Sequence, residues 1–381
     1  MINGNRVRQA RELVRLTQTE LATEIGTAQS TIAHIEGGLF QPSRQLVEAI
    51  AARLGFPFSF FEKGDPPNFP LGSLLFRSHK TASASEKLEA HRFGQLGFEM
   101  FSVMSKHVRN KITLRLPQII DEPGDYISAA QLTRDALGLS PEVPIPNLVK
   151  VVEQSGAILL MLPIQFEHCD AYSLWVNAPS SNPTYETKKP LIALSNDVPG
   201  DRLRLSLAHE LGHLVMHQSI KGTSSEIEDE AYKFASELLL PETAMRQQLT
   251  KPVTLSDLSV LKPVWGVSIQ ALIQRAYDLG FVTERQRTYL YKQVNTYAWK
   301  FDEPITIPSE KPRALRQMAE IVYGNPINYQ RLAHDLDMHP HLVKRMMDAY
   351  ATREEYSTRS VKRFDEVNKL FIMEERAPKK L

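Results

Sequence analysis

The apolar residues of the first sixty or so positions recur at helical spacing and are interrupted by glycines, which predicts a run of short helices. Thr17 and Glu20 have the spacing of a capping box at the start of the second helix. Gly26 ends that helix, Thr27 is expected to cap the third, and Ser43 the fourth. A fifth helical turn completes a compact domain. Its second and third helices are joined by a tight turn, the geometry that lays a helix into the major groove of DNA.

The pattern beyond this head changes several times along the chain. Residues 82–112 have a long helical pattern, which we interpret as a spacer or a dimerisation hairpin, and the chain beyond 260 is again mostly helical. Short apolar runs predict strands, and two amphipathic stretches predict strong helices. The strands are expected at 157–161, 172–176 and 191–194, an exposed loop at 179–190, and the helices at 201–217 and 226–240.

Composition adds limits on where the protein works. Net charge is +1, and in the first 62 residues six arginines balance six glutamates, so the head has no net charge. Four of those arginines lie in the first helix, where they offer a local positive face for phosphates. The single cysteine, Cys169, allows no intramolecular disulfide, and neither a signal peptide nor a membrane span is evident. We therefore expect a cytoplasmic protein.

The sharpest chemical signal is the run from His209 to His213, with Glu210 after the first histidine. On a helix, His209 and His213 are one turn apart and point to the same side, so both imidazoles can bind one metal ion. Glu210 lies about 100° further round the helix, where its carboxylate can hold and deprotonate a water. This pattern predicts one zinc per chain and a general base.

A catalytic zinc needs a third protein ligand, and the following helix offers three carboxylates. Glu228 heads a small, apolar face that continues through Ala231, Ala235 and Leu238, which favours it as the ligand. Glu230 is its rival and Glu226 a weaker candidate. We interpret His217, too far from His209 on a straight helix, as second-shell or structural, and Cys169 as a buried thiol.

Residues 5–62 resemble the Xre/lambda-repressor-like helix-turn-helix family. The resemblance rests on Arg11, the run 16–18, Leu21-Ala22, the run 26–30 and Ile35-Glu36-Gly37. It implies that Gln18 braces the recognition helix and contacts phosphate, and that Gln29 and Ser30 lie where the family contacts base edges. Arg11, Gln18, Thr27, Gln29 and Ser30 are therefore the candidate DNA-binding residues. Glutamine at such a position suits adenine.

Residues from about 125 to 245 resemble the ImmA/IrrE metallopeptidase family, through residues 202–208 before the histidines and the glutamate- and alanine-rich helix after them. The resemblance implies a gluzincin-like core with a small twisted sheet beside the active-site helix. It also implies His209, His213 and Glu228 as ligands and Glu210 as base. Tyr232 stands where the family usually has asparagine. Candidates for binding substrate backbone are Tyr172, Ser173 and the strand Leu191–Leu194.

These patterns predict an α+β, mostly helical protein. Its expected segments are a five-helix head (1–65), a linker and helical spacer (66–124), a metallopeptidase domain (125–260) and a helical C-terminal region (261–381). We expect a transcriptional regulator that binds a double-stranded DNA operator and cleaves a protein such as a repressor or antitoxin. The resemblance also implies that some members of the family respond to stress. Whether the protein is a homodimer stays open. The alternatives are a metal site that senses without cleaving, and an antitoxin-like partner-binding body. Glu210 favours cleavage, because a purely structural site needs no base.

Overall fold

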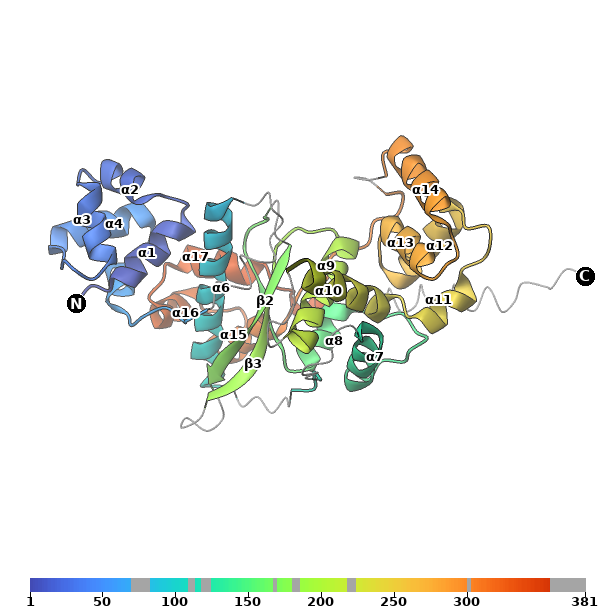
Figure 1. The fold of residues 1–381 in the computed structure, drawn as a ribbon. Helices are drawn as coiled ribbons and strands as arrows, with labels where there is room; N and C mark the ends of the chain where they lie inside the picture. The colour runs from blue at the N-terminus through green and yellow to red at the C-terminus, as the bar shows by residue number, and fades with distance from the viewer. Residues whose placement is uncertain are drawn as a thin grey trace, which may run out of the picture. The chain divides into compact units, whose positions relative to one another are not determined.

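The computed structural model describes residues 1–69, 83–108, 114–117, 125–166, 170–179, 186–217, 224–299 and 303–356. The chain divides into two compact units, each assembled from three separate segments. Unit 1 comprises 1–111, 158–196 and 312–350, and unit 2 comprises 112–157, 197–311 and 351–381. The α+β, mostly helical prediction is confirmed: helices dominate both units, and unit 1 contains a three-stranded sheet (Figure 1).

The head of unit 1 is a cluster of four α-helices and one 3-10 turn, drawn in blue in Figure 1. Their bounds are α1 Gly4–Leu13, α2 Gln18–Glu24, α3 Gln29–Glu36, α4 Arg44–Leu54 and η1 Phe58–Glu62. The capping box of Thr17 with Glu20 is confirmed, and Ser43 caps α4 as predicted. Both caps satisfy backbone N–H groups that the first helical turn leaves without a partner.

One predicted cap in the head is wrong. Thr27 does not cap α3, because α3 begins at Gln29 and its N-cap residue is Ala28, which makes no side-chain cap. The N–H of Thr27 instead donates to the carbonyl of Ala22, 2.9 Å away, in the turn between α2 and α3. Gly26, in the left-handed region at φ 70°, makes this turn so tight that Thr27 stays inside it.

The sheet of unit 1 has the strand order β1-β3-β2, with β1 Ile158–Met161, β2 Ala171–Pro179 and β3 Glu186–Leu194. β3 is central: it runs parallel to β1 and antiparallel to β2. The predicted loop at 179–190 is therefore wrong for 186–190, which belong to β3, while 180–185 lie outside the described residues. Thr187 and Lys188 are exposed, yet their backbones pair with β2, so their polarity misled the prediction.

A long helix, α6 (Ala84–Ser105), packs on the head and on the sheet of unit 1. It is a single helix and not a hairpin, and it contacts α1, β1 and β2. Gly94 lets the sheet approach closely, since a Cβ there would lie 1.8 Å from the hydroxyl of Tyr172. That hydroxyl donates to the carbonyl of Ala90, 3.1 Å away. α6 is thus a packed part of the unit 1 core.

Three C-terminal helices complete unit 1: α15 Ala314–Tyr323, α16 Tyr329–Leu336 and α17 Pro340–Asp348. The turn between α16 and α17 repeats the turn of the head. Asp337 is left-handed where Gly26 is, and the N–H of Met338 donates to the carbonyl of Ala333 at the same 2.9 Å. α17 also lines a recess of about 390 Å³ with Pro163 and Asn196.

Unit 2 contains eight α-helices among its described residues. They are α7 Tyr126–Ala136, α8 Leu148–Gln154, α9 Gly200–Met216, α10 Ser224–Leu239, α11 Glu242–Gln248, α12 Leu255–Trp265, α13 Ile269–Asp278 and α14 Glu284–Thr296. The predicted helices at 201–217 and 226–240 are confirmed as α9 and α10, which pack on each other and on α7. Arg204 fixes α9 in the core: its guanidinium is buried and donates to Glu310, 2.5 Å away, and to the carbonyl of Ile145.

The buried His91 of α6 is expected to make the protein acid-sensitive. Burial lowers its pKa from 6.5 to about 4, helped by Arg92 and opposed by a hydrogen bond to the carbonyl of Phe69. The unfolded chain binds a proton near pH 6.5 and the folded chain only near 4. The stability contributed by neutral His91 is therefore present above pH 6.5 and is lost as pH falls towards 4, by about 2 kcal/mol at pH 5 and about 3 kcal/mol at pH 4.

Thermal unfolding at pH 7.5 and pH 5 tests this expectation. His91→Gln should lose less stability between the two pH values than the wild type does. The control His341→Gln, at an exposed position of α17, should lose as much as the wild type. An equal loss in wild type and His91→Gln would contradict the assignment.

Candidate metal centre and DNA-contacting helix

The candidate metal centre is built on α9, whose sequence after Leu205 is almost entirely buried. His209 and His213 are 7% and 1% exposed, and Glu210 between them is 3% exposed. Gly212 allows α10 to approach this turn, because a Cβ at Gly212 would lie 2.9 Å from the ring of Phe234. The histidine pair is therefore held in the α9–α10 interface of unit 2.

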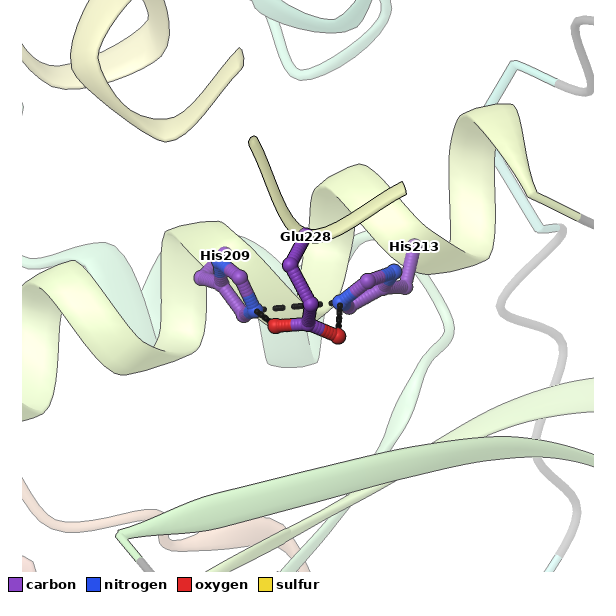
Figure 2. Close-up of side chains that lie close together, drawn as sticks. All are labelled: His209, His213 and Glu228. Atoms are coloured by element: carbon purple, nitrogen blue, oxygen red, sulfur yellow. Dashed lines mark hydrogen bonds and ion pairs between the residues drawn. The ribbon is translucent and has the colours of Figure 1, made fainter. Parts of the chain in front are cut away.

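Glu228 enters the same interface from α10. Ala231, Ala235 and Leu238, which share its helix face, are fully buried, as their spacing predicted. The two carboxylate oxygens of Glu228 lie 3.1 Å from Nε2 of His209 and 3.3 Å from Nε2 of His213. Figure 2 shows the carboxylate lying across the two imidazoles, which project from one side of α9. The structure thus brings together the three residues that the sequence singled out.

This donor set fits a zinc ion. The two Nε2 atoms are 3.0 Å apart, so all three pairs of ligand atoms are separated by 3.0–3.3 Å. Ligands at the zinc distances of about 2.0–2.1 Å lie about 3.3 Å apart in a tetrahedron. Burial raises the pKa of Glu228, but hydrogen bonds and charge interactions with His209 and His213 outweigh burial and leave the pKa well below its usual range. The carboxylate therefore stays ionised, as a metal ligand must be.

The rival glutamates lie elsewhere. Glu226 is exposed on the first turn of α10. Glu230 points to His217, with its Oε2 3.0 Å from Nε2 of His217. His217 follows the last residue of α9, and its Nδ1 lies 3.0 Å from Nδ1 of His213, on the side of that ring away from Glu228. Cys169 lies outside the described residues.

Tyr232 packs directly on His209, the first histidine of the pair. Its ring centroid is 4.2 Å from that of His209, and Nδ1 of His209 is buried without a hydrogen-bond partner among the described residues. The sequence analysis missed this contact, although Tyr232 is one helical turn after Glu228, a spacing that places the two side chains together. An aromatic ring therefore covers His209 at the position where the family resemblance led us to expect asparagine.

The proposed substrate-backbone residues lie on two neighbouring strands of the sheet, β2 and β3. Tyr172 and Ser173 are 1% and 0% exposed. Leu191–Leu194 pairs with β1 on one side and β2 on the other, so this strand has no open edge. Leu191–Leu194 is therefore wrong as a free strand edge, because strand order, which the sequence pattern does not reveal, places it at the centre of the sheet. Tyr172 and Ser173 lie on β2 at the edge of the order β1-β3-β2, and their role in binding substrate backbone stays a prediction.

In the head, a chain of hydrogen bonds presents the start of α3. Gln29 Nε2 donates to Gln18 Oε1, and Gln18 Nε2 donates to Glu36, both at 2.8 Å. Glu36 also accepts from two nitrogens of Arg11, which is 8% exposed. Gln29 and Ser30 themselves are exposed. The amide of Gln29 is therefore oriented by Gln18 and remains open towards solvent.

The four arginines expected in the first helix, of which Arg15 lies after the end of α1, do not form the free positive face that the sequence suggested. Arg6 pairs with Glu99 of α6, and Arg15 pairs with Glu89 of the same helix. Arg8, like Arg11, lies against Glu36, at 3.4 Å. These carboxylates neutralise the cluster and attach the head to α6.

The fold and the side-chain cluster together define a helix-turn-helix protein with a metallopeptidase-like domain. Residues 7–61 match a family model described as Helix-turn-helix, and residues 172–277 match a peptidase-family model described as the IrrE N-terminal-like domain. The predicted fusion of an Xre-like head with an ImmA/IrrE-like domain is therefore confirmed over these ranges. No curated protein matched the chain. Among the described residues, no helix is both long and apolar enough to cross a membrane.

Proposed function

We propose that this protein is a cytoplasmic DNA-binding transcriptional regulator whose peptidase domain uses one zinc ion to cleave a protein partner, such as a repressor or antitoxin. The observation that carries the proposal is the convergence of His209, His213 and Glu228 beside a buried Glu210. Such a set provides three protein ligands, a base and room for a fourth ligand, which is the arrangement of catalytic zinc sites. The match to a peptidase family supports the same reading.

Each residue has a distinct part in the proposed reaction. Zinc supplies Lewis-acid activation of the scissile carbonyl and of the attacking water. His209 and His213 would hold the ion through Nε2, and Glu228 would hold it through its carboxylate. Glu210 takes a proton from the water and passes it to the leaving amine, the usual task of a carboxylate base.

Metal analysis tests this half of the proposal. The purified chain should contain about one zinc, because the site offers one set of three ligands among the described residues. Mass spectrometry of the native protein and elemental analysis give the stoichiometry. The absence of first-row metal in the purified protein, together with no uptake when zinc is titrated in, would reject the metal centre.

In the DNA-binding part of the proposal, Gln29 and Ser30 of α3 contact base edges, and Thr27 lies in the turn before them. Arg11 contributes indirectly, because it holds Glu36, which in turn accepts from Gln18. Gln18 occupies one N–H of the Gln29 amide, and the second N–H and the carbonyl oxygen remain for an adenine, which glutamine binds through both groups. Gln18 itself is proposed to contact phosphate.

Gln29→Ala is expected to lose about 1–3 kcal/mol of discrimination at one base pair of the operator, with little change in non-specific binding. Fluorescence anisotropy on operator variants, at fixed salt, measures the loss. The control Gln45→Ala removes an exposed glutamine from α4 of the same head and should leave discrimination intact. Wild-type protein that binds every sequence equally would refute specific recognition by α3.

A further inference from the structure

A second chain of contacts lies behind the three proposed ligands. From His213 it runs through His217, whose Nδ1 is 3.0 Å from Nδ1 of His213, to Glu230, whose Oε2 is 3.0 Å from Nε2 of His217. The side chain of His213 is fully buried, and those of His217 and Glu230 are 8% and 23% exposed. These three groups are thus largely shielded from water. Hydrogen bonds are stronger in such surroundings and constrain the orientation of a ring more tightly.

The chain has a defined direction. A carboxylate is only an acceptor, so the Nε2 of His217 that faces Glu230 must be the donor. Neutral His217 then has an unprotonated Nδ1, which accepts from the Nδ1–H of His213. Neutral His213 in turn carries its lone pair on Nε2 when zinc takes the place of the proton that the Glu228 carboxylate would otherwise accept from this atom. The chain selects the tautomer of His213 that a metal ligand requires.

The other histidine has no such support. Nδ1 of His209 has no hydrogen-bond partner among the described residues, and its ring is covered by Tyr232. Glu230 is not part of the cluster of His209, His213 and Glu228, because its carboxylate binds His217 on the far side of the His213 ring.

We propose that Glu230 and His217 are positioning residues, which fix the tautomer and the orientation of His213 for metal binding. This inference rests on the proposed metal centre. Groups that hold a ligating histidine through its second nitrogen typically contribute 10–100-fold to metal affinity. Glu230 therefore contributes less to zinc affinity than a direct ligand does, and more than a surface carboxylate does.

The test compares zinc dissociation constants, measured by competition with a chromophoric chelator, in the full chain. Glu230→Ala and His217→Phe should weaken zinc binding about 10–100-fold. His217→Gln, whose side-chain carbonyl can accept from the Nδ1–H of His213, should recover part of the loss. Asp229→Ala, which removes an exposed carboxylate of the same helix paired with Lys233, is the matched control and should bind zinc as the wild type does.

A second readout separates positioning from folding. Nitrogen-15 NMR of metal-free Glu228→Ala, in which no Glu228 carboxylate faces Nε2 of His213, should show His213 protonated at Nδ1 and His217 at Nε2, and adding Glu230→Ala should remove this preference. Wild-type zinc affinity in both Glu230→Ala and His217→Phe, or a His213 protonated at Nε2 in metal-free Glu228→Ala, overturns the inference and leaves the metal centre standing. A wild type that binds no zinc overturns the metal centre, and the inference with it.

Discussion

Glu210→Gln should reduce proteolysis by at least about 10²–10⁴-fold, the range for removing a general base, while zinc content, fold and operator affinity stay as in the wild type. Glutamine has the size of glutamate, so the buried position beside His209 remains filled. It cannot take up a proton as a carboxylate does. Zinc is retained because Glu210 is not among the three converging ligands.

Mass spectrometry of candidate repressor proteins, incubated with either form, measures this effect, and a reporter on the operator measures regulation in parallel. Glu226→Gln, an exposed glutamate of α10, is the matched control and should cut like the wild type. If Glu210→Gln cuts and regulates like the wild type, the peptidase assignment fails. If neither form cuts any candidate and both regulate normally, the metal domain is a sensor.

Glu228→Ala should weaken zinc binding by more than about 100-fold, beyond the loss expected for Glu230→Ala, because it removes a direct ligand and not a support of one. It also leaves two buried imidazoles without the carboxylate that now lies between them. The expected order of zinc affinity is therefore Glu226→Ala, then Glu230→Ala, then Glu228→Ala as the weakest. Chelator competition gives all three constants, and a Glu230→Ala variant weaker than Glu228→Ala would show that the ligand was chosen wrongly.

Much of this protein could be predicted from local sequence, because the deciding interactions are local. Thr17 with Glu20, and Ser43, are caps whose partners lie three residues away. His209 and His213 meet because one helical turn separates them. Glu228 could be favoured over Glu230 since the small residues after it mark the buried face of α10. Each of these predictions needed only the period of a helix.

Apart from the Thr27 cap, which the tight turn at Gly26 prevents, the failed predictions concern residues whose surroundings come from distant parts of the chain. The polar residues 186–190 form a strand because β2 pairs with them, and Leu191–Leu194 loses its edges because β1 pairs on the other side. Arg6 and Arg15 look like a phosphate-binding face until Glu99 and Glu89 of α6 are found against them. These two ion pairs join residues 93 and 74 positions apart, and neither they nor the strand order leave a periodic signal in the sequence.

The two kinds of domain and the pairing of His209 with His213 could be derived from sequence alone, since these depend on helix period and residue chemistry. Only the tertiary structure decided that Glu228 and not Glu230 lies across His209 and His213, because the direction of each carboxylate depends on how α10 docks on α9. The same docking turns Glu230 towards His217. The tertiary structure also decided that each compact unit collects three separate segments, because burial of apolar faces, which sequence order does not encode, selects the partners.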